Sequence, residues 1–289
     1  MLPPLLYSTI SVLGFITADA NSQPPPSPVA NFTFNGTYAD ETGTISNAQA
    51  FGTYFTTNRF GESNSAIGFN GSQYARISGL GNLLSGKSGI SIAGWYLVQN
   101  GKNHPFSYSS GFIENTSLGA GVSPAIRLSV SGDPYNGIQG NMGRWSDVHT
   151  TTVFPMGNWA HLTIVLQEAT TPLIYKDGVA LQWGSTPATF TPITFASDYG
   201  IGVDITDGNP FYSTYSVGAV SDLKFYDVAF TSDQVQALYN SERPVYEVTL
   251  TLKSSTNMTD WIPVLTNIVE TYNPQEFYKN DISVRIKAP

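Results

Sequence analysis

Aromatic and planar polar side chains gather in one stretch of the sequence, residues 133–149, which is rich in Gly and Asn. A carbohydrate site pairs the flat face of an aromatic ring with side chains that hydrogen-bond to hydroxyl groups. This stretch supplies both kinds of group, and a tryptophan further along the chain adds another ring. The glycan-binding candidates are Tyr135, Arg144, Trp145, Asp147 and Trp183. The alternative is that Trp145 packs on the edge of its own sheet.

A string that matches the phosphate-binding pattern G-x-x-x-x-G-K-[ST] runs from Gly81 to Ser88. A phosphate loop needs a strand before it and a helix after it, because the N-terminus of the helix faces the phosphates. Here the segment Ile90–Val98 follows almost at once, and it has the apolar pattern of a strand. The context of the string therefore argues against nucleotide binding.

The carboxylates of the sequence do not fall into a catalytic pattern. Glycoside hydrolysis needs two carboxyl groups about 5–9.5 Å apart, one on each side of the scissile bond. Asp40 and Glu41 are adjacent, so on a strand they would face opposite ways. Glu114, Asp147 and Glu168 each stand alone, and no G-x-S-x-G elbow occurs. We predict that the protein is not an enzyme, with a glycoside hydrolase of unrecognised site as the alternative.

The elements that would position these side chains are mostly short strands. Gly and Pro number 27 and 18, and charged residues make up 12 % of the chain, against about 25 % in typical soluble domains. Hairpin dipeptides such as Asn70-Gly71 and Asp177-Gly178 separate the apolar runs. One helix is predicted over residues 232–240, capped by Thr231 with Gln234 in a capping box. Strands are predicted at 31–34, 73–77, 90–98, 125–130, 159–166, 172–175, 199–203 and 219–226.

Several large or polar residues within these strands and turns are predicted to have structural roles. Trp95 and Trp159 should fill the space between two packed sheets, which lie about 10 Å apart. His161 is predicted to be a strand residue whose ring is hydrogen-bonded. Asp177 is predicted to be a solvated turn residue.

Charge and cysteine content exclude several classes of protein. The net charge is −8, and the 13 basic residues are scattered singly, so we predict no nucleic-acid partner. The absence of cysteine excludes a disulfide framework, a thiolate zinc site and a cysteine nucleophile. The longest mostly apolar stretch, Leu5–Ala18, is shorter than the roughly 20 residues that cross a bilayer. No membrane span is predicted.

Residues 1–28 are predicted to be an apolar N-terminal arm followed by a Pro-rich linker. The sequence Ala18-Asp19-Ala20 fits the cleavage site of a signal peptide, which remains the alternative. A signal peptide begins with positive charge, whereas the first basic residue here is Arg59. Four prolines between Pro24 and Pro28 should form a stiff spacer. We expect the arm to dock on a neighbouring subunit.

An ordered series of motifs resembles a known family. The series is Phe34-Asn-Gly-Thr37, Asp40-Glu-Thr-Gly43, Asn58-Arg-Phe-Gly61, Phe69-Asn-Gly-Ser72, Tyr74-Ala-Arg-Ile77, Ile92-Ala-Gly-Trp95, Gly157-Asn-Trp-Ala-His-Leu162, Ile174-Tyr-Lys-Asp-Gly178 and Val220-Ser-Asp-Leu-Lys-Phe-Tyr226. Over residues 29–241 the chain resembles the laminin-G-like, concanavalin A-like jelly rolls. The resemblance implies an all-β sandwich of two antiparallel sheets with one short helix, forming a domain at residues 29–243.

The resemblance also implies a structural calcium ion. Many members of the family bind Ca²⁺ near the first strand, after an early Gly turn and through an acid near the last strand. The matching ligands would be Asn31, Gly71 and Asp222. The family often has two acids before the last strand, whereas this chain has Ser221 followed by Asp222. The oxygen-rich run from Asp204 to Gly208 is a second candidate calcium site.

Residues 244–289 are predicted to form a small C-terminal β appendage of three strands. The segments Val245–Leu252 and Ile282–Ile286 alternate cleanly, and Asp260–Leu265 is apolar. So small a sheet is marginal alone, so it should pack on the sandwich or on another subunit.

Three classes of function remain. The first is a non-catalytic structural and recognition module of a larger assembly such as a phage particle, a decoration, tail or fibre-type protein. It would form a homo-oligomer through its arm and C-terminal strands, bind glycan or host surface, and lie on the virion or outside the cell. The second is a secreted lectin-like protein, and the third is the glycoside hydrolase. We favour the first, because the arm is apolar without a single Lys or Arg and no catalytic constellation occurs.

Overall fold

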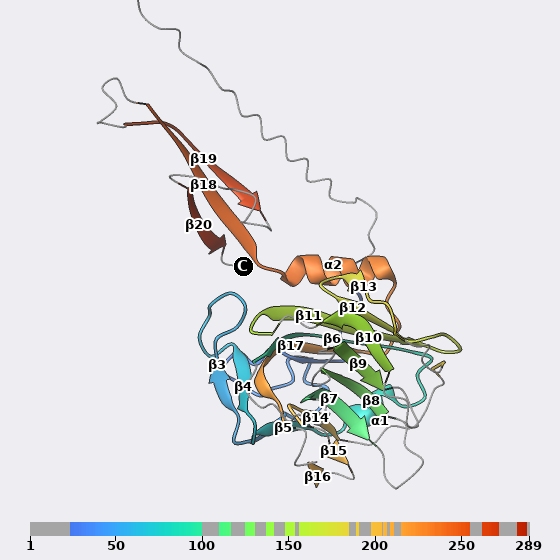
Figure 1. Ribbon diagram of the computed structural model, residues 1–289. Helices are drawn as coiled ribbons and strands as arrows, with labels where there is room; N and C mark the ends of the chain where they lie inside the picture. The colour runs from blue at the N-terminus through green and yellow to red at the C-terminus, as the bar shows by residue number, and fades with distance from the viewer. Residues whose placement is uncertain are drawn as a thin grey trace, which may run out of the picture.

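The computed structural model describes two large β-sheets packed face to face, a helix on the outer face of one of them, and a small third sheet (Figure 1). The described residues are 24–99, 110–116, 125–130, 137–141, 148–153, 156–184, 189–190, 198–203, 205–206, 209–210, 215–254, 262–271 and 282–287. The apolar part of the predicted N-terminal arm, residues 1–23, lies outside them. No helix among the described residues is long and apolar enough to cross a membrane.

Sheet A has eight strands in the order β13-β12-β11-β6-β17-β4-β3, with β1 paired to β17. Its three longest strands are buried on both faces over most of their length, which explains their nearly continuous apolar sequences. The strands are β1 (Ala30–Phe32), β3 (Tyr54–Thr56), β4 (Ala66–Asn70), β6 (Gly89–Val98), β11 (Trp159–Gln167), β12 (Leu173–Lys176), β13 (Val179–Ala180) and β17 (Val217–Tyr226).

Sheet B has nine strands, in the order β10-β9-β8-β7-β14-β5-β2, with β15 and β16 attached at β7. The pairings between neighbours in this order are antiparallel, as the sequence predicts. The strands are β2 (Gln49–Phe51), β5 (Tyr74–Ile77), β7 (Ser110–Thr116), β8 (Ala125–Val130), β9 (Gly137–Asn141), β10 (Val148–Val153), β14 (Tyr199–Ile201), β15 (Ile205–Thr206) and β16 (Asn209–Pro210).

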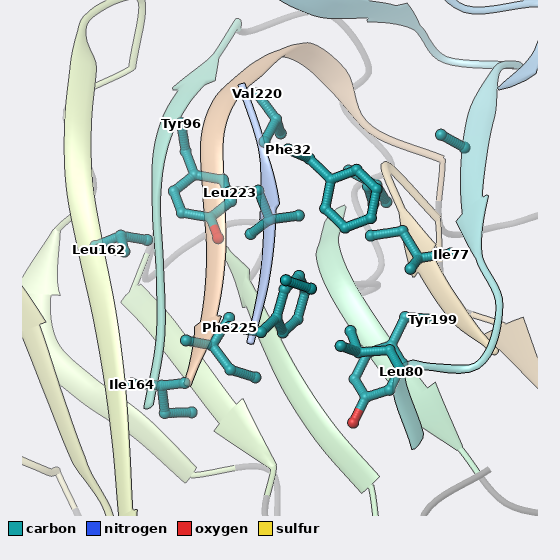
Figure 2. Packing of buried hydrophobic residues seen from close by; sticks show 14 of the residues in the cluster. Phe32, Ile77, Leu80, Tyr96, Leu162, Ile164, Tyr199, Val220, Leu223 and Phe225 are labelled. Atoms are coloured by element: carbon teal, nitrogen blue, oxygen red, sulfur yellow. The ribbon is translucent and has the colours of Figure 1, made fainter. Parts of the chain in front are cut away.

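The main core fills the space between the sheets. Figure 2 shows aromatic rings from β1, β6, β14 and β17 among aliphatic side chains of the same layer. Phe225 forms edge-to-face contacts with Phe32 and Tyr199, with ring centroids 6.5 and 5.8 Å apart. The rings of Phe32, Tyr96, Tyr199 and Phe225 are fully buried. Burial of these large side chains is the main stabilisation of the sandwich.

Two helices accompany the sheets in the part of the chain that the structure describes, where the sequence predicts one. The unpredicted helix, α1 (Leu80–Leu84), is a single buried turn between β5 and β6. Its residues overlap the phosphate-loop string, and the strand β6 follows that string as expected. The predicted helix is α2 (Ser232–Glu242), two residues longer at its C-terminus than the prediction. Its capping box between Thr231 and Gln234 is confirmed.

Helix α2 covers the outer face of sheet A. Val235 and Leu238 pack there in a second hydrophobic layer with Ala93 of β6 and Val165 of β11. Trp95 lies under this helix, with its ring centroid 5.9 Å from that of Tyr239. The prediction that Trp95 fills the space between the sheets is therefore wrong. Because β6 is covered on both faces, alternate residues enter different layers, and its neighbour Tyr96 takes the inter-sheet position.

The third sheet follows α2 and has the order β19-β18-β20. It comprises β18 (Val245–Ser254), β19 (Ile262–Thr271) and β20 (Ile282–Lys287), all antiparallel. In Figure 1 these strands stand apart from the sandwich, beyond the end of α2. They correspond to the predicted C-terminal appendage.

Substitution of Gly218 should disrupt sheet A. Gly218 has φ of +151°, and a Cβ there would lie 1.8 Å from the carbonyl oxygen of Leu97 in β6. We expect Gly218→Ala to lower the free energy of unfolding by about 3–5 kcal/mol, because two central strands must separate. Urea unfolding of the full chain measures this loss.

Gly36→Ala is the matched control. Gly36 has φ of +67°, with no atom within 4 Å of an added Cβ. Its substitution should cost only the left-handed backbone penalty of about 1–2 kcal/mol. Equal losses in the two variants would contradict the predicted steric conflict.

Candidate functional site

A cluster of rings lies on the face of β5 that points away from the main core. Ala75 and Ile77 enter the layer between the sheets, so Tyr74 and Arg76 take the opposite face of the strand. Phe51 of β2 is paired in register with Tyr74. We call Phe51, Tyr74, Arg76 and Tyr215 the aromatic patch.

The aromatic patch is a flat stack with a cation beside it. The rings of Phe51 and Tyr74 are parallel within 3°, with centroids 4.3 Å apart. Tyr215 lies 6.2 Å from Tyr74, and the guanidinium carbon of Arg76 lies 5.3 Å from the centroid of Phe51. Phe51, Arg76 and Tyr215 are each partly exposed. Ring faces and a planar hydrogen-bonding group thus meet at one surface, which is the combination that sugar recognition requires.

A second group of side chains forms a cluster of charges near β17. Arg59 donates to Asp222 at 2.5 Å and to the backbone carbonyl of Glu242 at 2.8 Å. The Glu242 carboxylate accepts from the Trp95 indole at 3.0 Å and also pairs with Lys224. We call Arg59, Asp222, Lys224 and Glu242 the charge cluster. It joins the end of α2 to sheet A.

The backbone at Asp222 is unusual. Asp222 has φ of +52°, and the pairing of β17 with β6 shifts register between Ser221 and Lys224. A bulge re-aims a side chain and commonly occurs beside functional sites. Here it brings the carboxylate of Asp222 to Arg59, whose guanidinium carbon also lies 4.3 Å from the ring of Phe60 and 4.4 Å from that of Trp95.

A cavity of about 550 Å³ opens beside this bulge. We call it the bulge cavity. Its lining mixes carboxylates, amides, hydroxyl groups and one ring. The lining residues are Asn31, Thr33, Asn35, Glu41, Asn58, Arg59, Phe60, Glu62, Ser65 and Asp222.

The expected calcium ligands are only partly brought together. Asn31 and Asp222 line the bulge cavity, whereas Gly71 lies in the turn between β4 and β5 and is not among its lining residues. The carboxylate of Asp222 already binds the Arg59 guanidinium. Calcium binding through these three residues stays a prediction. The second candidate includes Asp204, Asp207 and Gly208, which lie outside the described residues.

Trp183 has a structural position. Its indole N–H donates to the carbonyl of Pro172 at 2.9 Å, and its ring packs against the main core. Tyr135, Arg144, Trp145 and Asp147, the other predicted glycan-binding residues, lie outside the described residues.

His161 lies on a strand and Asp177 in a turn as predicted, but the expected surroundings of both side chains are wrong. His161 is fully buried, and neither ring nitrogen has a hydrogen-bond partner among the described residues. Its Nε2 lies 3.7 Å from the Glu242 carboxylate. Asp177 is not simply solvated, because its carboxylate accepts from the backbone N–H of His161 at 3.0 Å and pairs with Lys176 at 2.6 Å. The β12–β13 turn is thereby attached to β11.

The sequence contained a signal for the aromatic patch. In Tyr74-Ala-Arg-Ile77 the small and aliphatic residues alternate with a large ring and a cation, so one face of the strand is aromatic and basic. Pairing of Tyr74 with Phe51 and its contact with Tyr215 join distant parts of the chain. Local spacing could not reveal those contacts.

Comparison with protein families gives one match. The profile of the concanavalin A-like lectin/glucanases superfamily matches residues 69–236. No curated protein sequence matches the chain.

Solved structures share the fold at low identity. Domain 4 of AbnA, a GH43 extracellular arabinanase from Geobacillus stearothermophilus solved with arabinotriose, has a TM-score of 0.55 and 20 % identity, over 73 % of this chain and 98 % of that domain. Trypanosoma rangeli sialidase with sialic acid has a TM-score of 0.54 and 15 % identity. The match covers 74 % of this chain but only 32 % of the sialidase. The binding domain of Paraclostridial Mosquitocidal Protein 1 has a TM-score of 0.57 and 15 % identity. That match covers 89 % of this chain and 74 % of the binding domain.

The buried His161 predicts a specific dependence of stability on pH. Burial lowers the pKa of His161 from 6.5 to about 3, with Asp177 opposing the shift and Lys224 and Arg59 adding to it. At pH values below the ordinary pKa of histidine, the His161 imidazole binds a proton more readily in the unfolded chain than in the folded one. The free energy of unfolding should therefore fall as the pH falls from 6.5 towards about 3.

Urea unfolding at about pH 7 and about pH 5 tests this linkage. His161→Phe removes the titrating group, so its loss of stability between the two pH values should be smaller than that of the parent. Identical losses in the two proteins would contradict a buried neutral histidine.

Proposed function

The chain belongs to the concanavalin A-like lectin/glucanases superfamily, and from this membership we propose that it is a non-catalytic module that recognises glycans. The proposed contact surface is the aromatic patch on the outer face of sheet B. We further propose that the module is displayed on a larger extracellular assembly, such as a phage particle.

The observation that carries the proposal is the stacked pair Phe51 and Tyr74 with Arg76 beside it. The apolar face of a sugar ring stacks on an aromatic ring, and a guanidinium donates to its hydroxyl groups. Because Tyr74 is only 8 % exposed, it supports Phe51 from the side of the sheet, and the more exposed Phe51 is left to meet a ligand. A ring held in one orientation loses little entropy on binding.

Two relatives by fold were solved with carbohydrate. Domain 4 of the Geobacillus arabinanase was solved with arabinotriose, and the Trypanosoma sialidase with sialic acid. The arabinanase domain, 98 % of which the match covers, supports carbohydrate as the ligand class of the present chain, and binding experiments must identify the sugar.

The uses of the described buried carboxylates support a non-catalytic role. Burial alone would raise the pKa of Asp40, but hydrogen bonds from the backbone of Asn31, Ile45 and Thr42 and from the Thr42 hydroxyl outweigh it and hold that pKa below its ordinary value. Glu242 is held by Trp95 and Lys224. Carboxylates committed in this way stabilise the fold.

The third sheet supports attachment to partner subunits. Its register places Val248 of β18 between Val269 of β19 and Val284 of β20 on one face. Thr249, on the opposite face, is paired with Ser283 of β20. A three-stranded sheet with one apolar face is marginal alone, and a second subunit could cover that face. The first 28 residues, which carry no basic side chain, would add a further contact.

Substitution of the aromatic patch should weaken glycan binding. A glycan array probed with the full chain should give hits, and Phe51→Ala should weaken the best of them by about 1 kcal/mol, about fivefold in Kd. Arg76→Ala should have a similar effect, because it removes a planar donor. Isothermal titration calorimetry with the identified glycan measures both changes.

Tyr54→Ala is the matched control, since Tyr54 is a tyrosine on β3 of sheet A that is 47 % exposed. It should leave Kd unchanged. An array without hits, or an equal loss in Tyr54→Ala, would contradict the proposal. A loss in Trp145→Ala with no loss in Phe51→Ala would place the sugar on the stretch 133–149 instead.

The third sheet predicts an oligomer. The full chain should sediment as an oligomer, and Val248→Lys should shift it to monomer because a charge cannot be buried unpaired in an apolar contact. Thr249→Lys places the same charge on the opposite face and should leave the oligomer intact. Circular dichroism checks that both variants keep their strands. A monomeric parent, or identical behaviour of the two variants, would contradict this attachment and favour a secreted monomeric lectin.

A further inference from the structure

The bulge cavity is separate from the aromatic patch. Its lining comes from β1, from β17 and from the segments after β1 and between β3 and β4, whereas the patch lies on sheet B. We propose that this cavity binds an amino sugar whose nitrogen is unacetylated, so that the ligand carries an ammonium group.

The charges of the lining favour a cation. The lining holds three carboxylates, those of Glu41, Glu62 and Asp222. It holds one cationic group, the guanidinium of Arg59. Arg59 is committed to Asp222, which leaves Glu41 and Glu62 without an ion pair in the part of the chain that the structure describes. Both glutamates are exposed, so a ligand can approach them from solvent. The cavity should attract an ammonium group and repel sugars that carry carboxylates.

The cavity is also rich in unused hydrogen-bond acceptors. Glu41 accepts from Thr33 at one carboxylate oxygen, and Glu62 accepts from Asn58 at one. The second oxygen of each glutamate receives none from the described residues. Both glutamates are exposed, so a ligand with several donors can reach these free carboxylate oxygens.

The remaining lining suits a sugar better than a bare ion. Thr33 and Ser65 contribute hydroxyl groups, Asn35 and Asn58 contribute amides, and Phe60 contributes a ring. The volume of about 550 Å³ lies within the range of about 300–1,000 Å³ that small-molecule sites occupy.

The base of the cavity is rigid. The side chain of Arg59 is only 5 % exposed, and it is held by Asp222, by the Glu242 carbonyl and by the rings of Phe60 and Trp95. A calcium ion takes six to eight oxygen ligands, whereas Asp222 already has its cation. Arg59 thus neutralises Asp222 within the protein. Glu41 and Glu62 remain exposed to a ligand that carries hydrogen-bond donors.

Calorimetry with three matched trisaccharides tests the proposal. The full chain is titrated with the β-1,4-linked trisaccharide of glucosamine, with its fully N-acetylated form and with cellotriose. We expect saturable binding of the glucosamine trisaccharide alone, weakened by added salt because the contact is charged. The double variant Glu41→Gln with Glu62→Gln should weaken this binding about tenfold or more.

Two control variants distinguish binding in the bulge cavity from binding elsewhere on the protein. Glu168→Gln removes an exposed acid in the turn after β11 and should leave the affinity unchanged. Tyr54→Ala removes an exposed ring of sheet A that belongs to neither site and should also leave the affinity unchanged. The glycan array tests the proposed function at the aromatic patch separately, so failure here and failure of the proposed function are distinguishable.

Several results would overturn the proposal. These are no binding of the glucosamine trisaccharide, equal affinity for the three trisaccharides, or an equal loss in Glu168→Gln, which would indicate general attraction to an acidic protein. Saturable binding of calcium chloride that the double variant abolishes would make the cavity a metal site instead.

Discussion

The alternation of side chains along β-strands is the constraint on which the rest of this structure depends. Each strand of the two sheets gives one set of residues to the common core and must present the other set to the outside. On sheet A the outer set includes the apolar residues Ala93 and Val165, and α2 packs on them. On β5 of sheet B the outer set includes Tyr74 and Arg76, and no helix of the described residues contributes to the ring cluster there. The sandwich therefore exposes part of a ring cluster as a direct result of packing its core.

The second organising feature is the charge cluster at the end of α2. Glu242 is only 9 % exposed, yet it is supported by the Trp95 indole and by Lys224. Removing one partner from such a group is costly, because a charge would be left buried. The cluster fixes α2 on sheet A, fixes Arg59 against Asp222, and so shapes the bulge cavity. Stability and the geometry of a candidate ligand site therefore come from the same contacts.

Local patterns in the sequence predicted local structure well. The capping box at Thr231 formed as expected, and the fold class followed from strand patterns and ordered motifs. Long-range placement could not be predicted in the same way. Arg59 meets Asp222 across 163 positions, and Trp95 meets Glu242 across 147. Spacing along a strand also could not reveal that α2 would cover sheet A, which is why Trp95 was assigned to the wrong layer.

The central claim is that glycans bind on the outer face of sheet B. The most direct test is an NMR titration of the full chain with a bound glycan, following the backbone amide of each residue. Chemical-shift changes concentrated on β2, on β5 and around Tyr215 are predicted. Changes confined to residues 133–149, or to the surface of α2, would contradict the account.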